Sequence, residues 1–238
     1  MTSLKAPILA IVASALLASC ARDTEHLFES PCPAPCWYGI IPGTTTRREF
    51  LDLMPSLPYY REEDAHWREV EVSDAGALPA SQPYALGTFS MATPGGSAAI
   101  YVELVDSVVS LTEISSAWGF FSLNDIGLTL EGAIAFYGEP SEVILGKGCG
   151  GDQACYNLFL LYPNVRTIVQ AELETYPPDI TISPSLQIRR VTFLSDDRYP
   201  EYLEANIGYS LQCLRRSFAL PWPSYGPRHF DEDLNTCD

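Results

Sequence analysis

Residues 123–143 read LNDIGLTLEGAIAFYGEPSEV, and this stretch predicts a short helix that leads into a strand. Thr129 has the side chain of an N-cap, whose oxygen accepts a hydrogen bond from the first backbone N–H groups of a helix. Glu131 follows in the first turn, where the helix dipole favours a negative charge. Gly138 suits the left-handed position after a helix, and Pro140 cannot continue one.

The apolar residues inside this stretch recur at helical spacing. Leu130, Ile134 and Tyr137 fall on one side of a helix, with Ala133 and Phe136 beside them, so we expect this face to be buried. The next residues, Ser141–Leu145, have the composition of a strand.

A weaker copy of the same pattern lies at residues 39–54. In this copy Thr46 and Glu49 have the spacing of a capping box, and the helix is expected to stop at Pro55. Because Gly and Thr begin many helices, chance similarity is the alternative to an internal duplication. At a constant offset of 84 positions, Gly43, Thr45 and Phe50 correspond to Gly127, Thr129 and Ile134.

Each of these helices is followed by segments that alternate like strands. In the first part they are Trp67–Ser73, Tyr84–Met91 and a hairpin of Ala98–Val105 with Val108–Ser115, and in the second part Tyr156–Tyr162, Val165–Leu173 and Leu186–Leu194. Residues 174–185 are expected to form a Pro-rich excursion, Glu201–Ala219 a helix, and the remaining tail an irregular segment.

This order predicts an α+β fold with two similar halves, each a short helical segment followed by an antiparallel sheet of about four strands. The expected organisation is a signal peptide (1–19), a lipidated tether (20–31), a first half (32–118), a second half (119–200) and a C-terminal helix with a disulfide-closed tail (201–238).

The N-terminus predicts export. Lys5 precedes an apolar run, Ile8–Leu17, that is too short for an ordinary membrane span and is typical of a signal peptide. The run ends in Leu17-Ala18-Ser19-Cys20, which resembles the bacterial lipobox. The resemblance implies that Cys20 becomes the lipid-bearing first residue of a protein held at the outer side of a membrane. The alternative is an ordinary signal peptide with an incidental cysteine.

Removing Cys20 leaves an even number of cysteines in an exported chain, which favours disulfides. For Cys32 and Cys36, a metal or redox site next to Trp37 is the alternative. Their placement favours three local pairs, Cys32–Cys36, Cys149–Cys155 and Cys213–Cys237.

Charge and motifs exclude several classes of function. The formal net charge of −16 argues against nucleic acid as a partner, because a phosphate backbone requires a basic face. The sequence has neither a paired-histidine zinc motif nor a serine-hydrolase elbow nor a phosphate loop. We therefore expect no metal, no cofactor and no catalytic residues.

Four aromatic residues are the candidates for binding another molecule. Trp222, Tyr225 and Phe230 lie in the irregular tail, where Trp and Tyr often anchor partners. Trp118 lies at the join of the two halves. Packing over the sheet, or between the halves, is the alternative for all four.

The helix start and exit are similar to those of SmpA/OmlA-type outer-membrane-assembly lipoproteins. Gly127, Thr129, Tyr137, Gly138 and Pro140 match that family's Gly-x-Thr start and Gly-x-Pro exit, whereas the first copy keeps only the start. The tandem form resembles the β-lactamase-inhibitor-protein architecture, and the opening Pro-Cys-x-x-x-Cys-Trp is similar to a group of uncharacterised lipoproteins. The resemblance implies a small non-catalytic domain whose sheet face or loops touch other proteins.

Together these features predict a lipid-anchored module that binds another envelope protein or serves envelope assembly. One alternative is a solute- or glycan-binding lipoprotein with an aromatic-lined cleft between the halves, near Trp118. The other is a hydrolase in which two carboxylates converge in such a cleft.

Overall fold

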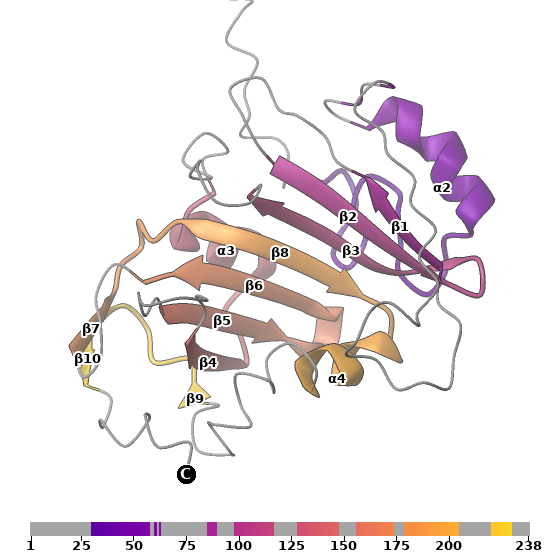
Figure 1. Cartoon of the computed structure of the whole chain (residues 1–238). Helices are drawn as coiled ribbons and strands as arrows, with labels where there is room; N and C mark the ends of the chain where they lie inside the picture. The colour runs from indigo at the N-terminus through magenta and orange to yellow at the C-terminus, as the bar shows by residue number, and fades with distance from the viewer. Residues whose placement is uncertain are drawn as a thin grey trace, which may run out of the picture.

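A computed structural model describes residues 30–57, 60, 62, 85–89, 98–116, 128–147, 156–173, 179–204 and 220–229. This part has α+β architecture, with short helices packed on one eight-stranded antiparallel sheet of order β1-β2-β3-β8-β6-β5-β4-β9 (Figure 1). Its strands are β1 (Ala85–Phe89), β2 (Ala98–Val105), β3 (Val108–Ser116), β4 (Glu142–Lys147), β5 (Tyr156–Tyr162), β6 (Thr167–Glu172), β8 (Ile188–Leu194) and β9 (Leu220–Pro221).

The remaining elements are short. A second sheet pairs β7 (Asp179–Ile182) with β10 (Gly226–His229). The helices are α2 (Arg47–Leu53), α3 (Leu130–Tyr137) and α4 (Arg198–Tyr202), with 3₁₀ turns η2 (Met54–Ser56) and η6 (Pro163–Val165).

The hairpin expected from the alternating pattern is confirmed. β2 and β3 pair antiparallel and turn at Asp106 and Ser107, whose φ angles of 51° and 63° are both positive. Two positive φ angles give the turn a twist that matches the twist of the flanking strands.

The helix expected before Pro55 is confirmed, because α2 ends at Leu53 and the chain continues as the separate 3₁₀ turn η2, whose second residue is Pro55. Two other sequence predictions about local structure are wrong. The Pro-rich excursion contains β7, and the tail contains β9 and β10. These short strands lack a long alternating pattern, and the pairing between β7 and β10 joins segments that are far apart in the sequence.

Instead of two separate sheets, a single sheet spans both parts of the chain. β3, from residues 32–118, pairs directly with β8, from residues 119–200. Both strands have apolar residues on both faces, for example Leu111 and Ile114 in β3, which are 2% and 0% exposed. A strand of this kind is unfavourable at a sheet edge and is stable between two other strands.

The two faces of the sheet have different coverings. The larger apolar core contains Phe50 of α2 and Leu130 and Ala133 of α3, so these helices cover the same face. The smaller core contains Leu111, Leu194 and Tyr202 of α4, so α4 covers the opposite face. In Figure 1, α4 lies in front of the sheet and α3 lies behind it.

The central helix follows the sequence prediction closely. Thr129 is the N-cap of α3, and its Oγ1 accepts a hydrogen bond from the Gly132 N–H at 3.2 Å. Gly138 ends the helix with φ = +83°, a conformation that glycine adopts without a Cβ clash. The capping box at α2 is also present, with Thr46 as N-cap and Glu49 as its partner.

These caps correct the offset between the two helices. The N-caps are Thr46 and Thr129, which are 83 positions apart (129 − 46), so the offset of 84 that matches Thr45 with Thr129 is wrong by one residue. Thr45 has another role, because it is buried and its Oγ1 accepts a hydrogen bond from the Ile41 N–H at 2.7 Å.

Both helices are attached to the sheet by the same pair of backbone hydrogen bonds. In each case the residue after the N-cap donates to a strand segment, and that segment donates back to the residue before the cap. The bonds are Arg47 N–H to Ser107 O (2.7 Å) and Val109 N–H to Thr45 O (2.8 Å), and Leu130 N–H to Leu186 O (2.8 Å) and Ile188 N–H to Leu128 O (3.0 Å).

Candidate functional site

Two of the predicted binding residues lie in a short segment between two strands. β9 pairs with β4, and β10 pairs with β7, so the four residues from Trp222 to Tyr225 are held at both ends. A segment fixed in this way presents its side chains in a defined position, although it has no regular structure of its own.

Trp222 and Tyr225 have different environments. Trp222 is half-buried and packs against the main core. Tyr225 is 37% exposed, and its ring meets that of Trp222 edge to face, with centroids 5.8 Å apart and planes at 89°. This geometry is favourable for aromatic pairs. Trp222 therefore supports Tyr225, whose ring is partly open to solvent.

The exposed side of α3 contributes a second aromatic ring. Phe136 is 42% exposed, which corrects the expectation that it shares the buried face of this helix. The buried face contains Leu130 and Ala133, with Ile134 and Tyr137 partly buried beside them. Phe136 lies six residues after Leu130, which is about 240° around the helix, and so points away from the core.

Two carboxylates lie at the two ends of α3. Glu131, in the first turn of α3, and Glu139, just after it, are both exposed. Partial burial raises the pKa of Tyr225, and the negative charges of Glu131 and Glu139 raise it further. The backbone places Tyr225 alongside α3. Pro221 pairs with Glu142, just after Glu139. Gly226 pairs with Ile182, close to Pro184, whose carbonyl accepts a hydrogen bond from the Glu131 N–H at 3.0 Å.

We call Phe136, Tyr225, Glu131 and Glu139, with Trp222 beneath, the α3 patch. The sequence pattern indicated Trp222 and Tyr225 as binding residues but did not indicate the other members. The helical period places Phe136 off the buried face, and this signal could have identified it.

Below the α3 patch lies a buried aromatic layer. The rings of Tyr137 and Tyr162 have centroids 5.6 Å apart, and those of Tyr137 and Phe193 are 6.4 Å apart. Burial raises the pKa of both tyrosines, so their hydroxyls stay neutral. Neither hydroxyl has a hydrogen-bond partner among the residues that the structure describes. This layer gives the patch a rigid apolar base.

A buried ion-pair network on the opposite face is the second concentration of functional groups. Arg198 of α4 contacts Glu103 of β2 through Nε–Oε1 at 2.9 Å, and its Nη1 donates to Glu201 at 3.0 Å. The Ser110 hydroxyl donates to Glu103 Oε1 at 3.1 Å. Because the charged groups are paired with one another, this network holds α4 on the sheet.

A neighbouring cluster continues across the same face. Arg190 Nε lies 3.3 Å from Glu113 Oε1, and the Tyr202 hydroxyl donates to Glu113 Oε2 at 3.3 Å. Burial and the charge of Glu113 raise the pKa of Tyr202. Tyr202 therefore acts as a hydrogen-bond donor, which fastens α4 at a second point.

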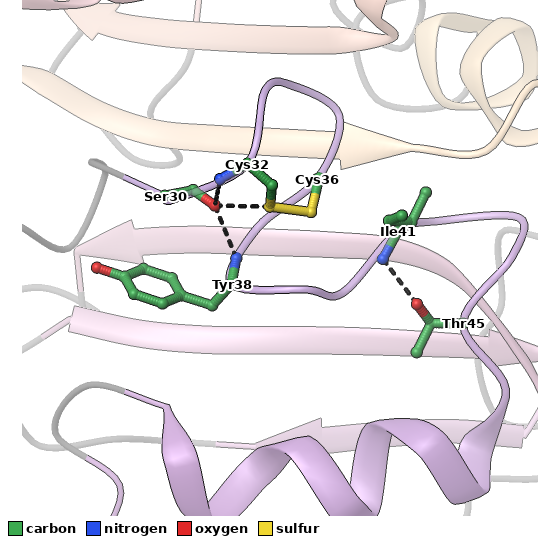
Figure 2. Close-up of a disulfide and its surroundings, with 6 residues drawn as sticks. All are labelled: Ser30, Cys32, Cys36, Tyr38, Ile41 and Thr45. Carbon is green, nitrogen blue, oxygen red and sulfur yellow. Dashed lines mark hydrogen bonds between the residues drawn. A yellow bond between two sulfur atoms is a disulfide. The ribbon is translucent and has the colours of Figure 1, made fainter.

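The segment before α2 contains a disulfide between Cys32 and Cys36, whose Cα atoms are 5.6 Å apart (Figure 2). The Ser30 hydroxyl oxygen accepts hydrogen bonds from the backbone N–H of Cys32 at 3.4 Å and of Tyr38 at 2.8 Å. Trp37, next to the disulfide, is 0% exposed. This arrangement fastens the start of the described chain onto the core.

Gly43, one of the glycines in the sequence pattern, lies very close to Ser195. Gly43 has φ = +84°, and a Cβ built there would lie 3.2 Å from Ser195 Cβ. Its N–H also donates to the Val109 carbonyl at 2.6 Å. Gly43 therefore lets this segment pass close to the end of β8.

The other predicted site residues lie outside the described residues. These are Cys20, Trp118, Phe230, Cys149, Cys155, Cys213 and Cys237. The cleft expected near Trp118 lies outside them as well. Within the described ranges, no three His, Cys, Asp or Glu side chains are grouped so that they could hold a metal ion.

No helix in the described part of the chain is long and apolar enough to cross a membrane. The chain matches no protein-family model, no curated protein and no solved structure. The α3 patch is therefore interpreted from its own chemistry. Exposed rings beside carboxylates can bind cationic groups or the apolar faces of sugars.

Proposed function

We propose that this chain is a lipid-anchored extracytoplasmic module that binds another envelope protein and performs no catalysis itself. The observation that carries the proposal is the exposed ring of Tyr225, which Trp222 supports; the exposed Phe136 on α3 adds a second ring. Aromatic side chains that are rigidly supported and partly exposed are the residues on which binding energy concentrates in protein interfaces.

The anchor in this proposal is a lipid on Cys20, based on the lipobox-like Leu17–Cys20 sequence. Between Cys20 and Cys32 the tether, residues 21–31, spans at most roughly 35–40 Å when extended. A tether of this length keeps the folded body close to the bilayer, where partners in the same envelope are within reach.

We also propose that the fold contains two related halves. The support is the matching pair of hydrogen bonds that attaches α2 to the start of β3 and α3 to the start of β8. β3 and β8 are the final strands of the two segments in the main sheet and pair with each other. Duplication of one helix-and-sheet unit would produce this arrangement if the last strand of each copy paired with the last strand of the other.

Glycan binding by the α3 patch is the second candidate, since Tyr225 and Trp222 lie near the carboxylates Glu131 and Glu139. Sugar recognition combines aromatic faces with carboxylate hydrogen-bond acceptors. The two candidates are separated by experiment.

Position-specific photocrosslinking in living cells tests the protein-binding proposal. A photoreactive phenylalanine analogue is placed at Tyr225, at Phe136 and, as a control, at Leu51 of α2, which is also 37% exposed. The proposal predicts one and the same envelope-protein adduct at Tyr225 and Phe136 and none at Leu51. Equal adducts at all three positions, or none at any, would contradict it.

A further inference from the structure

We propose that the α3 patch binds a basic protein segment, with an arginine or lysine side chain of the partner lying over the Tyr225 ring between Glu131 and Glu139. The proposal rests on the protein-binding function above and names the chemistry of the partner.

The charges of the patch favour a cationic partner. Glu131 and Glu139 are exposed. No ion pair between either carboxylate and another residue occurs within the described ranges. The whole chain has a formal net charge of −16, so long-range attraction also favours a basic molecule. An acidic or phosphate-rich partner would be repelled.

The rings of the patch supply the short-range part of the interaction. A guanidinium or ammonium group over an aromatic face is attracted by the electrons of the ring, and nearby carboxylates strengthen this preference. Tyr225 fits this role because Trp222 contacts it edge to face and supports it from one side. Phe136, which is 42% exposed, provides apolar surface for the stem of the cationic side chain.

The hydrogen-bonding groups of the α3 patch match Lys and Arg side chains better than they match sugars. Sugar hydroxyls both donate and accept hydrogen bonds, so a sugar site needs protein donors as well as carboxylate acceptors. The exposed polar groups of the patch are two carboxylates, which only accept, and one phenol. Cationic side chains are pure donors and match these acceptors.

The test uses the full chain and a fluorescent peptide of alternating arginine and serine, with a citrulline version as the uncharged control. Fluorescence anisotropy measures binding of each peptide. Soluble peptidoglycan fragments are assayed by calorimetry on the same protein. The predicted result is binding of the arginine peptide, weaker binding at higher salt, and no binding of the citrulline peptide.

Variants of the chain locate the binding surface. Tyr225→Ala should weaken binding about three-fold, and Phe136→Ala with Glu139→Gln should weaken it by a similar factor, as expected for exposed cation–π and ion-pair contacts. Tyr225→Phe, which keeps the ring, should bind like the unchanged chain. The matched control is Leu51→Ala with Asp52→Asn, which removes an exposed apolar residue and an exposed acid from α2.

Three results would overturn the proposal. Equal weakening in the α3 and α2 variants would mean that the peptide responds only to net charge. Binding of peptidoglycan fragments that depends on Tyr225, without peptide binding, would assign the patch to glycans. No binding of any probe, together with an envelope adduct at Tyr225 in cells, would reject a basic partner and leave the protein-binding function intact.

Discussion

Arg198 and Glu103 form a two-contact ion pair between residues that are 95 positions apart in the sequence. Arg198 Nε lies 2.9 Å from Glu103 Oε1, and Arg198 Nη2 donates to Glu103 Oε2 at 3.1 Å. The two side chains are only 8% and 5% exposed. This pair joins α4 to β2 on the sheet face opposite α2 and α3.

Removing one member of this pair should destabilise the fold strongly. Arg198→Met leaves Glu103 buried without its cation, and we expect a loss of about 3 kcal/mol in the free energy of unfolding. Urea denaturation measures the loss. Adding Glu103→Gln to that variant should recover part of it, since the buried charge is then gone.

The matched control for Arg198 is Arg166, whose partner Asp196 is 80% exposed. Arg166→Met should cost about 0–1 kcal/mol, as is usual for pairs in contact with water. Losses of equal size for the two arginines would show that burial of the Arg198–Glu103 pair is unimportant.

The two N-caps should contribute equally to stability. Thr46→Ala and Thr129→Ala each remove the side-chain oxygen that accepts a backbone N–H of the following helix, at an expected cost of about 1 kcal/mol. Thr→Ser at either position keeps the oxygen and should be close to neutral. Thermal or urea unfolding provides the comparison, and a serine variant as unstable as the alanine variant would reject the capping role.

The capping box at α2 should make stability sensitive to acid. The backbone hydrogen bond from Thr46, and then that from its side chain, lower the pKa of Glu49 below its ordinary value of 4.5. The folded pKa is thus below the unfolded one, so this contribution is complete above about pH 4.5 and is lost as the pH falls through the folded pKa.

Glu49→Gln isolates this acid sensitivity. The difference in unfolding free energy between the unchanged chain and the Glu49→Gln variant should be constant near neutral pH and should shrink as the pH falls below 4.5. Urea titrations at a series of pH values measure this difference. A difference that does not change with pH would mean that the Glu49 carboxylate has no special interaction with the N-cap.

The Cys32–Cys36 disulfide should stabilise the fold modestly. Closing so short a loop restricts the unfolded chain by about 2 kcal/mol in the chain-entropy account. The Cys32→Ser/Cys36→Ser variant, kept under oxidising conditions, should lose about this amount in urea denaturation. A variant that keeps its stability but loses a bound metal would favour the metal-site alternative for these cysteines.

Local signals in the sequence identified the elements whose geometry depends on neighbouring residues. Thr129 and Gly138 mark both ends of α3, and Asp106-Ser107 marks the turn of the β2–β3 hairpin. In each case a few adjacent side chains determine the backbone conformation, so a short window of sequence contains enough information.

Features that depend on distant segments were not predictable in this way. The pairing of β3 with β8 and the contact of Arg198 with Glu103 join residues that no local pattern relates. In the α3 patch, Tyr225 was identified as an aromatic residue in a loop. Its position beside Glu131 and Glu139 depends on how β9 and β10 hold the connecting segment.

The claim on which the functional account depends most is that a lipid on Cys20 holds the protein at the outer side of a membrane. Intact mass spectrometry of the chain extracted from its native membrane, with and without reduction and alkylation, tests it directly. We predict a chain that begins at lipid-bearing Cys20 and whose other cysteines become alkylatable only after reduction. A mature chain without lipid, or with free thiols before reduction, would contradict the account.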